Sequence, residues 1–178
     1  MEQKNKFKST VQEIRKETRN MKILYNPLTM KDSMEFYHLA GDKRVAATMR
    51  FDCPRNRNES DGILSEYISA GNHTFALRFK PTESLFGVFA FKKGSKSGIA
   101  DLSQMLLPEQ WGHGLGNQIV KDMVSLARKE KWYKALEGCV LESNTASRRM
   151  AEKNGFHEKE RHFLPEMKEK LVTYRIDL

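Results

Sequence analysis

Three glycines alternate with other residues in the segment from Gln110 to Asn117, which has the sequence QWGHGLGN. The apolar run Met105 to Leu107 comes shortly before it, and a strongly periodic helical pattern follows. The first N–H groups of a helix have no partner within the helix and carry partial positive charge, so they attract anions. Because glycine removes side chains that would block a ligand, the segment predicts a pyrophosphate site. The alternative is a tight turn that needs glycine only for positive φ, which three alternating glycines fit less well.

The glycine segment does not match the two best-known phosphate loops. A P-loop needs four residues between its glycines and then Gly-Lys-Ser/Thr, and neither condition is met here. In the dinucleotide fingerprint, counting from Gly112 puts Asn117 where a third glycine is required, and counting from Gly114 also fails. A nucleoside triphosphate and NAD are therefore disfavoured, and a different pyrophosphate cofactor remains.

A second motif runs from Asn144 to Phe156, with the sequence NTASRRMAEKNGF. Together the two segments resemble the GNAT superfamily of acetyltransferases, which bind acetyl-coenzyme A. The Trp-Gly-x-Gly form resembles the branch that contains ribosomal-protein N-terminal acetyltransferases and their small-molecule relatives, where Trp111 stands in place of the usual Gln or Arg. The second motif, Asn-x-x-Ser and then Glu-Lys-x-Gly-Phe, matches at Asn144, Ser147, Glu152, Lys153, Gly155 and Phe156.

The resemblance implies a fold and a cofactor site. The fold is α/β: a single GNAT-type domain with a central mixed, mostly antiparallel sheet, flanked by helices, whose fourth and fifth strands splay apart so that pantetheine enters the gap. Taken alone, Asn144 would be an N-cap that accepts from the N–H of Ser147. In the family the matching Asn also bonds pantetheine, and the matching Ser lies near the sulfur. The residues expected to bind the cofactor are Met105, Leu106, Leu107, Trp111, Gly112, His113, Gly114, Leu115, Gly116, Asn117, Asn144 and Ser147.

Composition sets wider limits. A chain of 178 residues is long enough for one domain with a proper core. We expect a charged extension over residues 1–20 and the acetyltransferase domain over 21–178.

No apolar run approaches a membrane span and the N-terminus lacks a signal-peptide core, so we expect a cytoplasmic protein. Cys53 and Cys139 are far apart and imply neither a disulfide nor a metal site, and no His/Cys/Asp cluster suggests a metal. The net charge of +8 is spread along the chain without interleaved aromatics, which favours an anionic cofactor over nucleic acid.

The patterns of apolar and turn-forming residues predict alternating strands and helices. A helix is expected to start near Thr29 and Asp32, and the stretch from Cys53 to Asp61 is expected to be a loop. Gly155 suits the left-handed position that ends a helix. The other expected helices cover 63–68, the residues after the glycine turn, and 145–154, and the expected strands are 22–28, 73–79, 85–91, 99–107, 135–141 and 172–178.

The chemistry of acetyl transfer to an amine requires an oxyanion donor, a proton for the departing thiolate and a neutral amine. The resemblance suggests backbone N–H groups near Leu106 as oxyanion donors. Many superfamily members protonate sulfur with a Tyr seven residues after the Asn, but Ala151 stands there. Ser147, or a water that it holds, is then the best candidate acid. The strand position that often carries a catalytic Glu aligns with Ala100, which leaves Asp101, Glu109, Glu142 or water as the base.

We therefore expect an acetyl-coenzyme A dependent N-acetyltransferase that works by direct transfer in a ternary complex, without a metal. The acceptor is a primary amine on a small molecule or a protein N-terminus, and a homodimer is one assembly open to the protein. The segments 49–52 and 162–165 are expected to contribute to the acceptor site. One alternative is a non-enzymatic protein that binds acyl-coenzyme A, which the missing Tyr and the unassigned base keep open. Another is an RNA- or ribosome-binding module, which rests only on basic charge.

Overall fold

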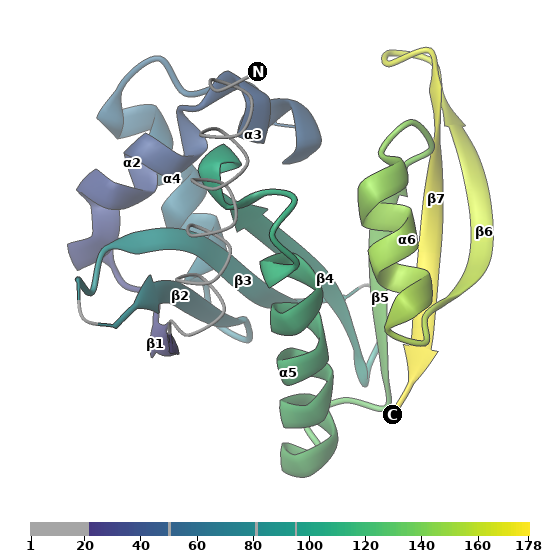
Figure 1. Cartoon of the computed structure of the whole chain (residues 1–178). Helices are drawn as coiled ribbons and strands as arrows, with labels where there is room; N and C mark the ends of the chain where they lie inside the picture. Colours follow the sequence, from purple (N-terminus) through teal and green to yellow (C-terminus); the bar gives the residue numbers. More distant parts are fainter. Residues whose placement is uncertain (1–21, 50, 81, 95) are drawn as a thin grey trace, which may run out of the picture.

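The computed structural model describes residues 22–49, 51–80, 82–94 and 96–178, so the expected extension over 1–20 lies outside the described residues. The described residues form a seven-stranded sheet with the order β1-β2-β3-β4-β5-β7-β6 (Figure 1). Neighbouring strands are antiparallel except β4 and β5, which are parallel. The strands are β1 (Ile23–Pro27), β2 (His73–Phe79), β3 (Leu85–Lys93), β4 (Ile99–Leu106), β5 (Ala135–Leu141), β6 (His157–Leu164) and β7 (Glu169–Asp177).

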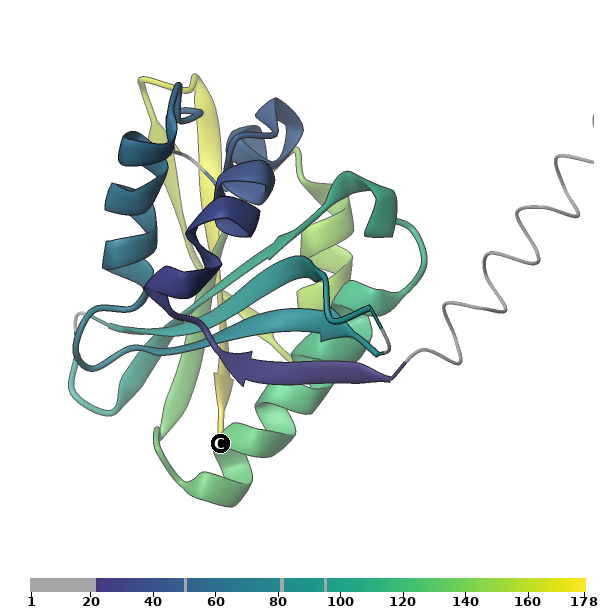
Figure 2. The same ribbon diagram turned by 90° about the vertical axis from the view of Figure 1, so that its left-hand side faces the viewer.

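Helices cover both faces of the sheet (Figure 2). On one face, helices α2 (Ser33–Ala40), α3 (Lys43–Met49) and α4 (Arg57–Tyr67), with the short 3-10 turn η1 (Met30–Asp32), enclose a core with Val88, Ala90 and Met105 of the sheet. On the other, α5 (Leu115–Glu130) packs on Phe89, Phe91 and Leu136 together with α6 (Thr145–Lys153). Strand β3 contributes side chains to both cores, because successive side chains along a strand point to opposite faces of the sheet. No helix in the described part of the chain is long and apolar enough to cross a membrane.

Strands β4 and β5 separate soon after they begin. They pair only where Ile99 to Asp101 lie beside Ala135 to Glu137. Beyond these three residue pairs the two strands diverge, and Figure 1 shows them spreading apart between α5 and α6. The expected α/β fold, a mostly antiparallel sheet with splayed fourth and fifth strands, is therefore confirmed.

The structure corrects the sequence predictions in three places. The predicted loop from Cys53 to Asp61 is wrong in its second half, because α4 already begins at Arg57. Its N-cap, Asn56, accepts from the backbone N–H of Glu59, an N-cap signal that the surrounding polar residues obscured. Helix α3 and strand β6 were not predicted. Helix α3 is only seven residues long, and β6 is exposed along almost its whole length, so its sequence shows no apolar alternation.

Candidate active site

The glycine segment connects β4 to α5 through a short 3-10 turn, η2 (Pro108–Gln110). Gly114 is the N-cap of α5 and lies in the left-handed region with φ = 82°. The first backbone bond into the helix runs from the N–H of Gln118 to the carbonyl of Gly114 at 3.1 Å. The N–H groups of Leu115, Gly116 and Asn117 precede it and have no partner within the helix. The segment thus presents successive backbone donors at a helix start, an arrangement that attracts anions.

The three glycines have two different structural reasons. Gly112 and Gly114 both have positive φ, and a Cβ added at either would meet no atom within 4 Å. The space next to these two residues is open. At Gly116 an added Cβ would lie 3.1 Å from Sδ of Met150, so glycine there lets α5 approach α6 closely. The conformational reason for glycine therefore applies to two of the three positions and is compatible with a ligand in the open space.

Side chains at both ends of the segment hold it in place. The indole Nε1 of Trp111 donates to the carbonyl of Leu106 at 2.9 Å, which ties the glycine segment to the end of β4. Gln104 donates weakly to the carbonyl of Gly116 at 3.4 Å. His113 has a buried ring nitrogen, Nδ1, without a hydrogen-bond partner among the described residues, and such an atom is costly to leave unpaired. Leu115, the first residue of α5, packs in the core.

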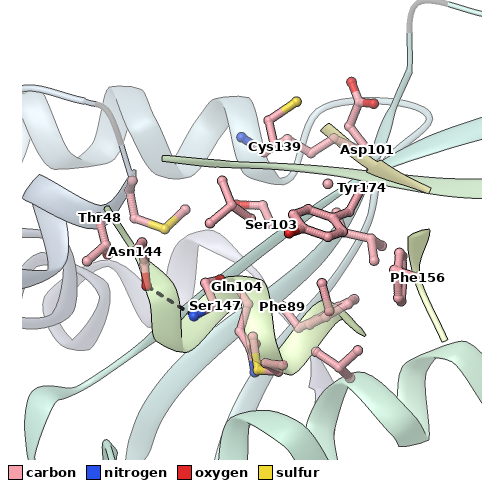
Figure 3. A pocket seen from close by; sticks show the side chains of 18 of the residues that line it. Thr48, Phe89, Asp101, Ser103, Gln104, Cys139, Asn144, Ser147, Phe156 and Tyr174 are labelled. Carbon is pink, nitrogen blue, oxygen red and sulfur yellow. Dashed lines mark hydrogen bonds between the residues drawn. The ribbon is translucent and has the colours of Figure 1, made fainter. Parts of the chain in front are cut away.

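The start of α6 places the second motif. Oδ1 of Asn144 accepts from the backbone N–H of Ser147 at 3.1 Å, so the predicted N-cap is confirmed (Figure 3). This bond uses only the amide oxygen and leaves the two N–H donors of the amide for another partner. At the other end of α6, Gly155 has φ = 83°, the left-handed conformation predicted for it. Nδ2 of the neighbouring Asn154 donates to Oδ1 of Asn117 at 2.9 Å, which connects the end of the second motif to the glycine segment.

A cavity of about 510 Å³ passes through the sheet at the gap between β4 and β5 (Figure 3). On the face that carries α5 and α6 its lining includes Gln104, Asn144 and Ser147. On the face that carries α3 and α4 its lining includes Asp101 and Ser103. The remaining lining residues are Thr48, Met49, Phe51, Ile63, Glu66, Tyr67, Phe89, Lys92, Leu102, Val120, Gly138, Cys139, Val140, Met150, Ala151, Phe156 and Tyr174. Two molecules that enter from opposite faces could meet in this gap.

Strand β4 directs different groups to the two sides. The N–H of Leu107 donates to the carbonyl of Phe86 on β3 at 2.8 Å. Because backbone groups alternate along an antiparallel ladder, the N–H groups of Leu106 and Gln104 point instead toward β5, where no strand pairs with them. The side chain of Met105 is buried among α2 and α4, so a ligand in the gap could contact only its backbone. The gap therefore offers two backbone donors that the sheet leaves unpaired.

On the face that carries α3 and α4, several polar side chains contact one another. The hydroxyls of Tyr67 on α4 and Ser103 on β4 are 2.6 Å apart, and Nζ of Lys92 lies 3.7 Å above the Tyr67 ring. Lys92 is opposite Asp101 in the β3–β4 register. Partial burial raises the pKa of Asp101, and the charge of Glu137 raises it further, while Lys92 and Lys159 oppose the shift. A raised pKa makes this carboxylate a stronger proton acceptor than an ordinary aspartate.

The structure separates the candidate bases. Asp101 lines the cavity, whereas Ala100 is fully buried in the core. Glu109 lies at the surface, 3.3 Å from Arg44, and Glu142 bonds to Arg161 at 2.6 Å. Neither Glu109 nor Glu142 is among the residues that line the cavity. Among the three carboxylates considered, Asp101 is thus the one at the gap.

Several lining residues were not predicted as parts of a site. Tyr174, on β7, lies among them, and its hydroxyl donates to Glu152 at 2.9 Å and accepts from Nε of Arg148 at 3.2 Å. Ala151 also lines the cavity. Of the expected acceptor segments, Met49 and Phe51 reach the cavity, and none of the residues 162–165 does. In the described ranges, no group of three or more His, Cys, Asp or Glu residues is placed to hold a metal ion.

Comparisons with known proteins agree with this geometry. The family model described as "Acetyltransferase (GNAT) domain" matches residues 22–157. A GNAT acetyltransferase from Bacillus anthracis superposes with a TM-score of 0.75 at 16% identity, over 87% of this chain and 94% of that one. Spermidine N-acetyltransferase from Vibrio cholerae, in complex with coenzyme A and spermine, gives 0.75 at 13% identity over 87% and 95%. An aminoglycoside acetyltransferase in complex with coenzyme A gives 0.70 at 15% identity over 88% and 95%. No match was found among curated proteins.

Proposed function

The chain belongs to the GNAT acetyltransferases, which use acetyl-coenzyme A, and on that premise we propose that it transfers the acetyl group directly to a primary amine while both substrates are bound. The acceptor is a small-molecule amine or a peptide N-terminus. One observation carries the proposal: a single cavity passes through the sheet at the unpaired ends of β4 and β5. A thioester on the α5/α6 side and an amine on the α3/α4 side would meet there without a covalent enzyme intermediate.

The proposed cofactor position follows from the two motifs. The pyrophosphate sits at Gly112 to Asn117, where the helix start, the open space beside two glycines and the unpaired Nδ1 of His113 all favour a ligand. Pantetheine then follows β4 into the gap, with the amide donors of Asn144 in reach. Trp111 would fix the loop through its bond to Leu106.

The proposed chemistry assigns one group to each charge that develops. The amine nitrogen attacks the thioester carbonyl, and the N–H of Leu106 stabilises the resulting oxyanion. Asp101, which lies five residues before Leu106 on β4 and thus about 16 Å from it along an extended strand, accepts the proton of the amine through water in the cavity, and its raised pKa suits a base. When the C–S bond breaks, Ser147, or a water that it holds, supplies a proton to the thiolate. The products are an amide and free coenzyme A.

A protein that binds acyl-coenzyme A without chemistry is the alternative, and Ala151 is the observation that favours it, since the usual proton donor is missing there. Release of free thiol separates the two proposals. Coenzyme A that appears only when an amine is added supports the enzyme. Tight binding of acetyl-coenzyme A without thiol release across a panel of amines supports the alternative.

Ligand-induced stabilisation tests the cofactor site. Acetyl-coenzyme A should raise the melting temperature of the wild type, because a ligand that binds only the native state stabilises it. Gly114→Val should abolish this rise, while ATP and NAD should give much smaller rises in the wild type. Because valine is strained at positive φ, Gly71→Val is the matched control: Gly71 also has positive φ but lies outside the site. A full ligand-induced rise in Gly114→Val would show that the pyrophosphate binds elsewhere.

We also propose a homodimer. Its support is the pair Phe163 and Met167 at the tip of the β6–β7 hairpin, two large apolar side chains that are exposed in the single chain. A partner subunit could cover them and remove their apolar surface from water. Light scattering measures the mass directly. A monomer at micromolar concentration would contradict this part of the proposal and leave the acetyl transfer untouched.

A further inference from the structure

The part of the cavity on the α3/α4 side, which we call the acceptor chamber, combines an apolar wall with polar and charged side chains. Met49, Phe51 and Ile63 line it and pack against the core of α2 and α4. The ring of Tyr67, which is 2% exposed, forms a further wall, with its hydroxyl held by Ser103. An apolar or aromatic group would displace water from these walls and gain free energy from burial.

Charge in the chamber is sparse and nearly balanced. Among the described residues that line the cavity, the charged side chains are Glu66, Lys92 and Asp101. Lys92 stands opposite Asp101 in the β3–β4 register, and its positive charge lowers the pKa of that carboxyl. Two carboxylates and one ammonium leave one net negative charge. Counted over these described residues, the chamber can therefore balance a single cation.

We infer that the acceptor is a monoamine whose amino group is carried on an apolar or aromatic body, and that Lys92 determines this preference; the inference rests on the proposed acetyl transfer. A polyamine or an aminoglycoside would bring several ammonium groups into the chamber. At least one of them would lie near Lys92 or against Met49 and Phe51, where an unpaired charge is costly. A polycation would thus bind more weakly than a monocation whose single ammonium is balanced by the net negative charge of the chamber and whose apolar part lies against Met49 and Phe51.

This assignment distinguishes the chain from proteins that share its fold. The spermidine and aminoglycoside acetyltransferases superpose on it with low sequence identity, and a common fold does not determine the acceptor. The chemistry of the chamber walls determines which acceptor binds. An arylalkylamine and a peptide N-terminus with an apolar first residue share the required features, and the experiment below separates these two sources.

The test compares amines of different charge on the full chain. Phenethylamine, isoamylamine and a short peptide with a free N-terminal Phe represent monocations, and spermidine and kanamycin represent polycations. Thiol release gives kcat/KM, and the melting temperature of the coenzyme A complex with each amine gives binding without turnover. We expect the best monoamine to exceed spermidine at least about tenfold in kcat/KM, equivalent to about 1.4 kcal/mol. A peptide that exceeds the small amines identifies the source as a protein N-terminus.

Lys92→Glu tests the specificity residue, with Lys92→Gln as a milder variant. Lys93→Glu is the control, because it changes the net charge equally from the neighbouring, exposed position, whose side chain points to the other face of the sheet. Lys92→Glu should move the ratio of monoamine to spermidine toward spermidine by about tenfold or more, and Lys93→Glu should not. A wild type that prefers spermidine or kanamycin, in rate or in binding, overturns the inference, as does an unchanged ratio in both Lys92 variants. If coenzyme A binds and no amine is acetylated, the proposed function fails, and amine binding still decides the preference.

Discussion

Replacing Asn144 by Asp and by Ala separates its helix cap from its proposed contact with the cofactor. The side chain caps α6 through Oδ1, which accepts from the N–H of Ser147 at 3.1 Å, and its N–H donors remain for the proposed bond to the cofactor. Aspartate keeps the acceptor that the cap needs but has no N–H donors when ionised. Alanine removes both functions. The two variants should therefore agree in cofactor affinity and differ in stability.

The size of each effect follows from these contacts. Loss of the cap in Asn144→Ala costs about 1 kcal/mol, which lowers the melting temperature of a chain of this size by about 2–4 °C. Asn144→Asp should stay near the wild-type melting temperature, because a carboxylate at a helix start also interacts well with the helix dipole. Loss of one hydrogen bond to the cofactor, about 0.5–1.5 kcal/mol, should raise the Kd of acetyl-coenzyme A about 2- to 10-fold in both variants.

Calorimetric titration with acetyl-coenzyme A and thermal unfolding without ligand measure the two quantities. A wild-type Kd in Asn144→Asp, together with a lower melting temperature in Asn144→Ala, would refute the cofactor role and reduce Asn144 to a helix cap. Equal losses of stability in both variants would show instead that the cap bond contributes little to α6.

Three further substitutions test the remaining roles. Ser147→Ala should lower kcat by about 10²-fold or less and leave the Kd of coenzyme A unchanged, because a group that protonates the leaving thiolate acts mainly in the transition state; a loss of stability alone would make it a helix residue only. Asp101→Asn should lower kcat by about 10²- to 10⁴-fold and remove the acidic limb of the pH–rate profile, which the raised pKa of Asp101 places above the range of an ordinary carboxyl. Since a carboxyl with a raised pKa in the folded state destabilises that state when ionised, Asp101→Asn should melt at the same temperature as the wild type or higher at pH 7, and an unaltered pH profile would contradict the assignment. Trp111→Phe should weaken coenzyme A binding about 2- to 10-fold in titration calorimetry, because the loop loses its 2.9 Å bond to Leu106; unchanged affinity would show that this bond does not order the loop.

The sequence predicted best the parts of the site that are local in the chain. The glycine segment and the Asn144 cap each depend on residues within a few positions of one another, and both have the expected backbone geometry. The segment 49–52 and Asp101 were predicted as parts of the acceptor side, but Tyr67 and Lys92 were missed, because they meet Asp101 only through the packing of α4 on the sheet and the β3–β4 register. In the sequence, Tyr67 fits an ordinary apolar helix position.

Strand β6 also has a physical reason for not having been predicted from the sequence. Strand β6 mixes acidic and basic residues and is exposed at nearly every position, so burial leaves no periodic signal. Two of its ion pairs, Arg161 with Glu142 and Lys159 with Glu137, form with residues on β5 or just after it. Strand β7, in contrast, carries four consecutive buried residues, Leu171 to Tyr174. The sequence predicted alternating buried and exposed residues over 172–178, and this alternation holds only in the last part of β7.

Initial-rate kinetics test the central claim most directly, namely the proposal that both substrates are bound in the cavity between β4 and β5 when the acetyl group moves. Thiol release is measured while acetyl-coenzyme A is varied at several fixed concentrations of an acceptor amine. Direct transfer predicts double-reciprocal lines that intersect, and the same pattern in Cys139→Ser, which removes the exposed thiol that lines the cavity. Parallel lines, together with an acetylated enzyme that accumulates on Cys139 when no amine is present, would contradict direct transfer.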